Sequence, residues 1–458
     1  MKLKILQAAA AFSMLLSVLS CESFTEVDMP QSQLTGTAVF EDVETANAAM
    51  SDIYARIREG GVSSGTLLSV TLLMGCYSDD MTFYGSNAEI EQLYSHAVVP
   101  SNSLVAYLWT SAYGQVYAAN AMIEGLERST SISAADRGRL LGEAKFIRAY
   151  LHFYLANLYG DIPYIATTDY GANAAAGKIP YRAAMERILA DLSAAESLLP
   201  ESYPTAERVR PNKAAATAML ARAYLYAENW EMAAQHAASV IGNPSYAWQP
   251  DLSLAFLKDS RSIIWALHAG TAGTNTKDAR TFSFTSGPPT KPALSEQLRN
   301  SFEAGDLRRS LWIKEVAGGT RSWYLPYKYK KTTNTGTSQE YTILFRLEEQ
   351  YLIRAEARAH LGDIAGARAD LNKSRNRAGL PDTPASDAAG LVAAVLQERR
   401  SEFFTEQGHR WFDLKRTGTA GQALGSLKPG WKATDAVLPL PESELLLNGN
   451  LLPQNAGY

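Results

Sequence analysis

The sequence predicts a mainly α-helical protein, built on a scaffold of tetratricopeptide-like helix-turn-helix repeats with a loop-rich, irregular insertion. Three observations support this fold class. Segment 143–163, EAKFIRAYLHFYLANLYGDIP, is apolar around most of a helical circumference, with a narrow polar line at Lys145, Arg148 and His152. Two later segments share a helix-turn-helix pattern, and the stretch between them is rich in Gly, Pro, Ser and Thr. A helix that is apolar on nearly every side has to be surrounded by other helices.

The first residues predict a lipoprotein signal peptide at 1–20. Lys2 and Lys4 are followed by a mostly apolar stretch, 5–19, which is too short to span a membrane comfortably. The apolar and small residues VLS directly before Cys21 look like a lipobox. We therefore expect cleavage before Cys21 and acylation of that residue, which anchors a protein because each buried CH₂ contributes roughly 0.8 kcal/mol. The alternative is an ordinary secretory signal with a chance cysteine.

Composition narrows the class of protein further. The chain has 458 residues, a formal net charge of −4 and two cysteines. Cleavage would leave Cys76 as the free thiol without a partner for an intrachain disulfide, so stability has to come from the core. Loss of Lys2 and Lys4 would change the net charge from −4 to −6, a mild, mixed charge that does not indicate a nucleic-acid partner. We predict one domain over 21–458.

Helical periodicity predicts the first part of the scaffold. Gly160 and Pro163 end the apolar helix, and Pro200 ends the helix after it. Residues 60–102 are punctuated by glycines and are predicted to be irregular, and long loops within a compact domain usually bind something. The helices expected here are 42–58, 104–127, 137–159 and 181–199.

The repeats follow. Residues 212–227 and 231–241 form one predicted helix pair, and 344–361 and 363–378 form the other. A shift of 134 residues aligns Ala223 with Ala357, Trp230 with Ile364 and Ala233 with Ala367. Small residues at such positions allow antiparallel helices to approach closely, as in tetratricopeptide packing. A last helix is expected at 392–406, followed by a loop-rich tail.

The insertion covers about 242–341. Only 294–304 and 307–316 have helical patterns there, and the Tyr-Lys-Tyr-Lys alternation at 327–330 predicts a strand with one buried face. We expect this segment to lie over the helical scaffold and to carry the binding surface.

Five segments resemble the SusD/RagB family when they are taken together with the lipobox. They occur in the family's order and span nearly the whole chain, with small departures at Ala456 and at Asn448-Gly449, where the family more often has proline. The segments are 143–163, 210–226 (RPNKAAATAMLARAYLY), 345–380 (FRLEEQYLIRAEARAHLGDIAGARADLNKSRNRAGL), 398–418 (ERRSEFFTEQGHRWFDLKRTG) and 438–458 (LPLPESELLLNGNLLPQNAGY).

The resemblance implies a surface lipoprotein of the Bacteroidetes outer membrane, anchored through Cys21. Such a protein sits as a lid on a SusC-like, TonB-dependent transporter, captures an oligosaccharide and delivers it, without catalysis and without a cofactor. The acidic residues Glu22, Glu26 and Asp28 resemble the family's surface-export signal. Peptide cargo, as in the RagB branch, is a close alternative.

Candidate ligand contacts come from the glycine-punctuated loop and from the insertion. Carboxylates accept hydrogen bonds from sugar hydroxyls, and tyrosine and tryptophan rings stack on the apolar faces of pyranoses. The alternatives are a helix cap, a turn residue or a calcium ligand for the two aspartates, and a core position for Trp323. The candidates are Tyr77, Asp79, Asp80 and Tyr84 in the loop, and Arg321, Trp323 and Tyr324 after the glycine pair 318–319.

Two other classes of protein compete with this hypothesis. A lipid-anchored glycoside hydrolase needs two carboxylates roughly 5–10 Å apart, and Asp79 or Asp80 with Glu89 or Glu91 is the available grouping. A repeat scaffold for envelope assembly would bind no small ligand.

The Glu and Arg residues of 398–416 predict an ion-pair network rather than an acid and base pair. The six histidines show no metal-ligand spacing, so no metal is expected.

Overall fold

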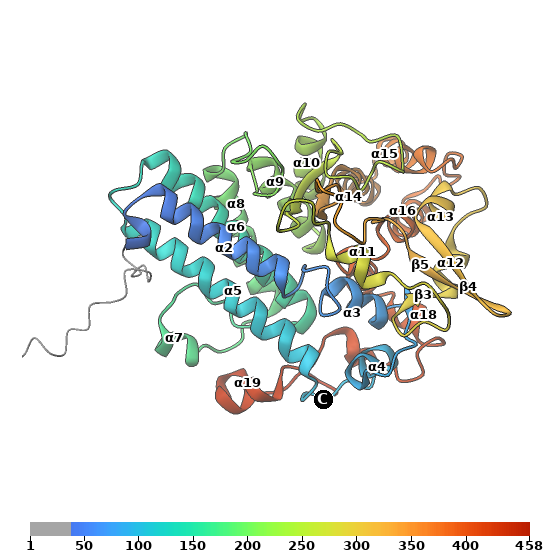
Figure 1. Ribbon diagram of the computed structural model, residues 1–458, viewed down its shortest axis with the longest axis horizontal. Helices are drawn as coiled ribbons and strands as arrows, with labels where there is room; N and C mark the ends of the chain where they lie inside the picture. The colour runs from blue at the N-terminus through green and yellow to red at the C-terminus, as the bar shows by residue number, and fades with distance from the viewer. Residues whose placement is uncertain (1–37) are drawn as a thin grey trace, which may run out of the picture.

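The computed structural model describes residues 38–458. The predicted signal peptide at 1–20, Cys21 and the acidic residues Glu22, Glu26 and Asp28 lie outside the described residues. Long helices fill one half of the molecule, and the repeats and the insertion fill the other (Figure 1). The first half contains η2 (Ala38–Phe40), α2 (Val43–Glu59), α5 (Ser103–Arg128), α6 (Ala134–Tyr159), α7 (Tyr170–Ala174) and α8 (Tyr181–Leu198).

Helix α6 is the centre of the first half. Every residue from 146 to 159 is buried, because α5 and α8 pack against the helix and α2 and α9 contact it as well. Two of the three residues of the polar line, Arg148 and His152, are buried as well, and Lys145 is partly exposed. Arg148 donates to both carboxylate oxygens of Asp191 on α8, each at 2.7 Å. The nitrogen Nε2 of His152 accepts the backbone N–H of Ile165 at 3.1 Å. The predicted enclosure of this helix is confirmed.

The two predicted helix pairs are present, and α10 of the first pair packs on α14 of the second. Ala223, Ala233, Ala357 and Ala367 are all completely buried, so the small residues do lie where helices approach each other. Asp363 caps the second helix of its pair by accepting the N–H of Gly366 at 2.9 Å. The helices are α9 (Lys213–Tyr226), α10 (Trp230–Ile241), α14 (Leu347–His360), α15 (Ile364–Arg377) and the following α16 (Ala388–Phe403).

Residues 60–102 contain more regular secondary structure than the sequence predicted. They contain α3 (Val70–Tyr77), α4 (Ala88–Ser95) and the short strand β1 (Met81–Thr82). All eight residues of α3 are buried, so the helix has no polar face from which a helical period could be detected. The C-terminal part carries α17 (His409–Arg416), α18 (Ala420–Leu424), η3 (Ala433–Ala436), α19 (Glu442–Leu447) and η4 (Gly449–Leu451).

Strands of the insertion take part in three two-stranded antiparallel pairings. Strand β2 (Ile263–Leu267) pairs with β6 (Thr342–Arg346), β3 (Ala293–Leu294) pairs with β1, and β4 (Ile313–Gly318) pairs with β5 (Arg321–Pro326). Short helices lie between the strands: α11 (Lys277–Phe282), α12 (Glu296–Ser301) and α13 (Leu307–Leu311). In Figure 1 the β4–β5 hairpin projects from the edge of the molecule opposite α2 and α5.

Two predictions for the insertion are wrong. The helix expected at 307–316 is only the short α13, and the chain then enters β4, because the turn at Gly318-Gly319 pairs β4 with β5. No strand forms at 327–330. Lys328 is instead buried, and its ammonium donates to the carbonyls of Glu402 and Phe404 at 2.7 and 2.8 Å. This contact with distant residues outweighs the local alternation.

Candidate ligand-binding site

The β1–β3 pairing brings the two predicted ligand segments to one corner of the molecule. Met81 lies opposite Leu294, and Thr82 lies opposite Ala293. Ser295 continues the junction, since its backbone N–H donates to the carbonyl of Asp80 at 2.9 Å and its hydroxyl donates to the carbonyl of Asp79 at 2.5 Å. Strand β3 also lies beside β5. The loop after α3 and the hairpin therefore form a continuous structure.

The two aspartates at this junction are buried, which argues against their predicted contact with a ligand. Asp79 is 5% exposed and accepts hydrogen bonds from Arg410 at 2.7 and 2.9 Å and from Arg400 at 2.8 Å. Burial acts to raise the pKa of Asp79, but the hydrogen bonds from Arg410 and the charge of Arg400 lower it overall. Asp80 is 2% exposed, and burial raises its pKa to about 6.

Tyr77 and Trp323 are also buried in the core, which argues against their predicted role in stacking on a ligand. Tyr77 is fully buried, and its hydroxyl donates to the carbonyl of Asp435 at 2.9 Å. Trp323 is 9% exposed because its indole lies against the backbone of Gly287 and Gly318. A Cβ atom at Gly287 would come within 2.0 Å of the ring, so glycine is required for this contact. The indole thus fixes the hairpin to the preceding loop.

Tyr324 points the other way and lines a cleft. Trp323 and Leu325 on β5 are buried, whereas Tyr324 between them is half-buried and lies opposite Glu315 of β4. The cleft has a volume of about 550 Å³, within the range of about 300–1,000 Å³ that is typical of ligand sites. We call it the hairpin cleft; its lining residues are Arg299, Gly305, Asp306, Leu307, Arg309, Ser310, Ile313, Glu315 and Tyr324.

The hairpin cleft combines an aromatic ring with groups that donate and accept hydrogen bonds. The guanidinium carbon of Arg299 lies 3.7 Å from the centroid of the Tyr324 ring. Arg309, Ser310 and Glu315 are exposed around it. Sequence analysis missed these four residues, although the glycine pair at 318–319 could have revealed the hairpin and, with it, Glu315 opposite Tyr324.

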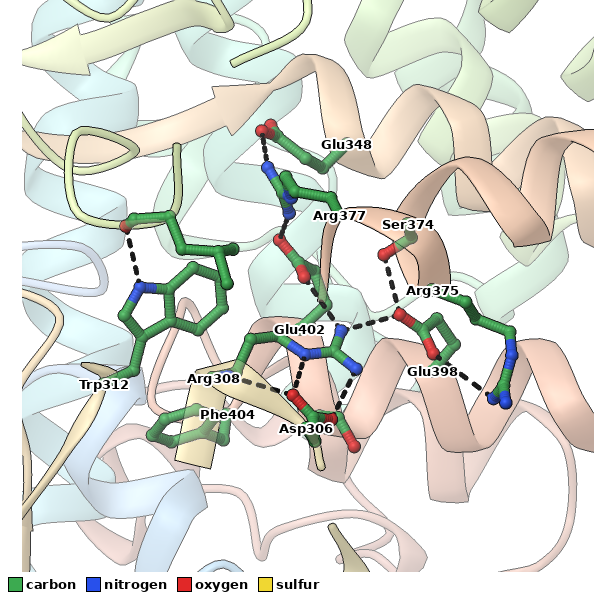
Figure 2. Close-up of polar contacts among 12 residues, drawn as sticks. Asp306, Arg308, Trp312, Glu348, Ser374, Arg375, Arg377, Glu398, Glu402 and Phe404 are labelled. Atoms are coloured by element: carbon green, nitrogen blue, oxygen red, sulfur yellow. Dashed lines mark hydrogen bonds and ion pairs between the residues drawn. The ribbon is translucent and has the colours of Figure 1, made fainter. Parts of the chain in front are cut away.

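A buried ion-pair network (Figure 2) reaches the hairpin cleft through Asp306, which lines it. Arg308 donates to both oxygens of Asp306 at 3.0 and 2.8 Å, to Glu398 at 2.6 Å and to Glu402 at 3.0 Å. Arg377 joins Glu402 to Glu348, so α13, α14, α15 and α16 are connected. The predicted ion-pair network of 398–416 is confirmed in the pairs of Asp413 with Arg399 and Arg416, and it extends well beyond that segment.

Tyr84 and Arg321 remain accessible. Tyr84, in the loop after β1, is 44% exposed, and Arg321 is exposed beside the turn of the hairpin. Neither residue lines the hairpin cleft.

The described part of the chain holds neither a metal-ligand cluster nor a membrane-spanning helix. Between residues 38 and 458, no three His, Cys, Asp or Glu side chains are grouped so that they could hold a metal ion. Over the same range, no helix is long and apolar enough to cross a membrane.

The helical repeats and the insertion with its cleft define a helical-repeat binding protein. The chain belongs to the SusD/RagB family. One family model, described as "Starch-binding associating with outer membrane", matches residues 24–225, and a second, described as "SusD family", matches residues 313–458. Members of this family are carbohydrate-binding proteins without catalytic activity. The glycoside hydrolase alternative is therefore excluded, in agreement with the burial of both aspartates and with the ion pairs of Asp79 with Arg400 and Arg410.

Relatives match over almost the full length. SusD-like proteins P2 and P25 of Formosa agariphila are 26% and 24% identical, and each alignment covers 97% of this chain and 98% or 97% of the relative. A SusD superfamily protein from Bacteroides vulgatus has the same fold, with a TM-score of 0.80 at 21% identity over 91% of this chain and 99% of that one. A laminarin-binding SusD-like protein has a TM-score of 0.76 at 24% identity, with the same coverage of both chains.

Proposed function

We propose that this chain is a cell-surface lipoprotein that binds an oligosaccharide at the hairpin cleft and delivers it to a SusC-like, TonB-dependent outer-membrane transporter. The observation that carries the proposal is the position of Tyr324 among Arg299, Arg309 and Glu315 in a cleft of about 550 Å³. The laminarin-binding neighbour and the starch-binding description of the family model support a glucan as the ligand.

The chemistry of the hairpin cleft suits a sugar. The Arg299 guanidinium lies over one face of the Tyr324 ring, so a pyranose would place its C–H groups against the rest of this half-buried ring. Arg309 and Arg299 can donate to hydroxyl and ring oxygens, and the Glu315 carboxylate can accept from two hydroxyls. Because the cleft holds both positive arginines and a negative glutamate, it suits a neutral ligand with many hydroxyl groups. Tyr84 and Arg321 would contact a longer chain that continues across the nearby surface.

Calorimetry of the soluble protein beginning at residue 22 tests the ligand. We expect laminarin or starch oligosaccharides to bind, and we expect Tyr324→Ala to weaken binding about tenfold, which corresponds to about 1.4 kcal/mol. The matched control is Tyr351→Ala, a half-buried tyrosine on α14, outside the cleft lining. Equal affinity in the two variants would contradict this placement of the site. Binding of a protein digest, with no glycan bound, would favour the peptide alternative.

Anchoring and delivery need the full chain in its own outer membrane. We expect the wild type to be labelled with fatty acid and to co-purify with a TonB-dependent barrel. Cys21→Ala should lose the label and the membrane fraction while the soluble protein still binds glycan. Absence of any such barrel from the purified wild-type complex would contradict the role in delivery.

A further inference from the structure

A second cleft, about 430 Å³ in volume, lies on another face of the molecule, between α5, α7 and the C-terminal α19. Figure 1 shows α7 and α19 beside α5, far from the β4–β5 hairpin. Trp109 and Tyr113 of α5 line this aromatic cleft together with Tyr117, Tyr170, Glu444 and Leu447. It shares no lining residue with the hairpin cleft.

Hydrogen bonds between distant segments build the walls of the aromatic cleft. The Tyr113 hydroxyl donates to the carbonyl of Pro163 at 2.7 Å, which ties α5 to the segment before α7. The amide of Asn448 donates to the carbonyl of Ala176 at 2.8 Å, which ties the end of α19 to the segment after α7. Because three separate parts of the chain are fixed together, the cleft is formed before any ligand arrives.

The aromatic cleft exposes far more aromatic and aliphatic surface than a solvated face needs. Tyr170 is 86% exposed, Leu447 is 83% exposed and Tyr117 is 52% exposed. Tyr170 and Leu447 are the two most exposed large apolar side chains in residues 38–458. Exposed apolar groups collected around a concave site indicate a ligand that covers them.

The polar groups of the aromatic cleft limit the chemistry of that ligand. Arginine and lysine are absent from its lining, so among the described residues nothing there favours an anion. The Glu444 carboxylate is half-buried in the wall, and Asn173 uses its amide nitrogen on the carbonyl of Thr167 at 2.8 Å, which leaves its oxygen as an acceptor. Acceptors beside tyrosine rings match a neutral ligand that has hydroxyl donors and an apolar face.

The geometry points to a second saccharide-binding site in the aromatic cleft, where Tyr117 and Tyr170 stack on pyranose rings and Glu444 and Asn173 accept hydroxyl hydrogen bonds. A peptide is a poorer fit, because the cleft is walled by helices and loops and offers no strand edge for an extended backbone to join. The inference shares its ligand class with the proposed function but uses a different face. Two sites on one chain would increase the avidity for a long polysaccharide without any new contact at either site.

The test counts bound oligosaccharides per chain by calorimetry, with short laminarin and starch oligosaccharides as probes. We expect the wild type to bind two molecules and the double variant Tyr117→Ala/Tyr170→Ala to bind one, with about a tenfold loss of affinity for polymeric laminarin or starch. Tyr324→Ala should leave the aromatic cleft unaffected and weaken binding at the hairpin cleft about tenfold. Since Tyr117 and Tyr170 are largely exposed, their loss should leave the melting temperature unchanged.

The outcomes separate the two sites. A double variant that still binds like the wild type overturns the second site and leaves the proposed function in place. A glycan lost only in the double variant, with Tyr324→Ala unaffected, supports the second site and contradicts the hairpin cleft. If the double variant bound saccharides like the wild type but no longer co-purified with the barrel, the face with the aromatic cleft would contact a protein. That result would overturn the saccharide site.

Discussion

Arg410 and Asp79 form a bidentate ion pair across 331 residues of sequence, with the Nε–Oδ1 distance at 2.7 Å and the Nη2–Oδ2 distance at 2.9 Å. Arg400 adds a third hydrogen bond to the same carboxylate. The pair joins the segment after α3 to α16 and α17, and the backbone of Asp79 in turn holds Ser295 at the start of α12. Asp79 therefore supports the corner that carries the hairpin cleft without facing it.

Asp79→Asn should destabilise the protein by about 3–5 kcal/mol, because it leaves two largely buried guanidinium groups without their charge partner. Urea unfolding measures this loss. The control is Asp52→Asn, which breaks an exposed pair with Arg56 and should change stability very little. A loss at Asp79 no larger than at Asp52 would show that the buried pair does not stabilise the junction.

Asp80 should make stability depend on pH in the opposite direction from an ordinary ion pair. Its pKa is raised from 3.8 to about 6 by burial, so the folded protein binds this proton more tightly than the unfolded chain does. Its contribution is fully present below about pH 4 and is lost as the pH rises through about 6. We expect Asp80→Asn to be more stable than the wild type at pH 7 by on the order of 1–3 kcal/mol.

The pH dependence distinguishes Asp80 from its neighbours. The pKa of Asp79 is lowered from the ordinary value of 3.8, so its contribution to stability is lost only as the pH falls below that value. The stabilities of the wild type and Asp80→Asn should therefore be compared between about pH 5 and 7.5, where Asp79 stays ionised. In that window the stability advantage of Asp80→Asn should shrink as the pH falls. An advantage that stays constant with pH would mean that Asp80 does not titrate there.

Trp323 and Tyr324 are adjacent but should respond differently to substitution. Trp323→Ala removes a buried indole from between two glycine backbones and should cost about 3–5 kcal/mol, with faster amide exchange in β4 and β5. Tyr324→Ala should lower glycan affinity with little change in the unfolding midpoint. If both variants lost glycan affinity and stability to the same extent, the division of β5 into a packing face and a binding face would be wrong.

Arg308 should couple the ion-pair network to ligand binding. Arg308→Ala leaves the carboxylates of Asp306, Glu398 and Glu402 without their shared cation and should destabilise the fold by about 3–5 kcal/mol. Because Asp306 lines the hairpin cleft, glycan affinity should fall as well. Arg308→Lys keeps the charge but cannot reach three carboxylates at once, so we expect an intermediate effect. Normal affinity in Arg308→Ala at a temperature where the protein is folded would separate the network from the site.

The sequence by itself determined the helical scaffold. Residues on one surface of a helix recur at intervals of three and four positions, and capping residues and glycines mark the two ends of the helix. The signals that define a helix therefore lie within or directly beside it in the sequence. For this reason the expected ranges for α2, α5, α8, α9 and α10 agree with the structure to within one or two residues at each end. The two repeat pairs and the family motifs were detectable for the same reason.

Only the tertiary structure decided which side chains of the loops are accessible. Asp79, Asp80, Tyr77 and Trp323 have the chemistry of ligand contacts, but partners hundreds of residues away, or the glycines of a facing loop, bury them. Likewise, the cleft residues Arg299, Arg309 and Glu315 lie close together only because α12, α13 and the hairpin pack side by side in the fold. Burial depends on contacts between distant segments, and a local sequence pattern does not encode these contacts.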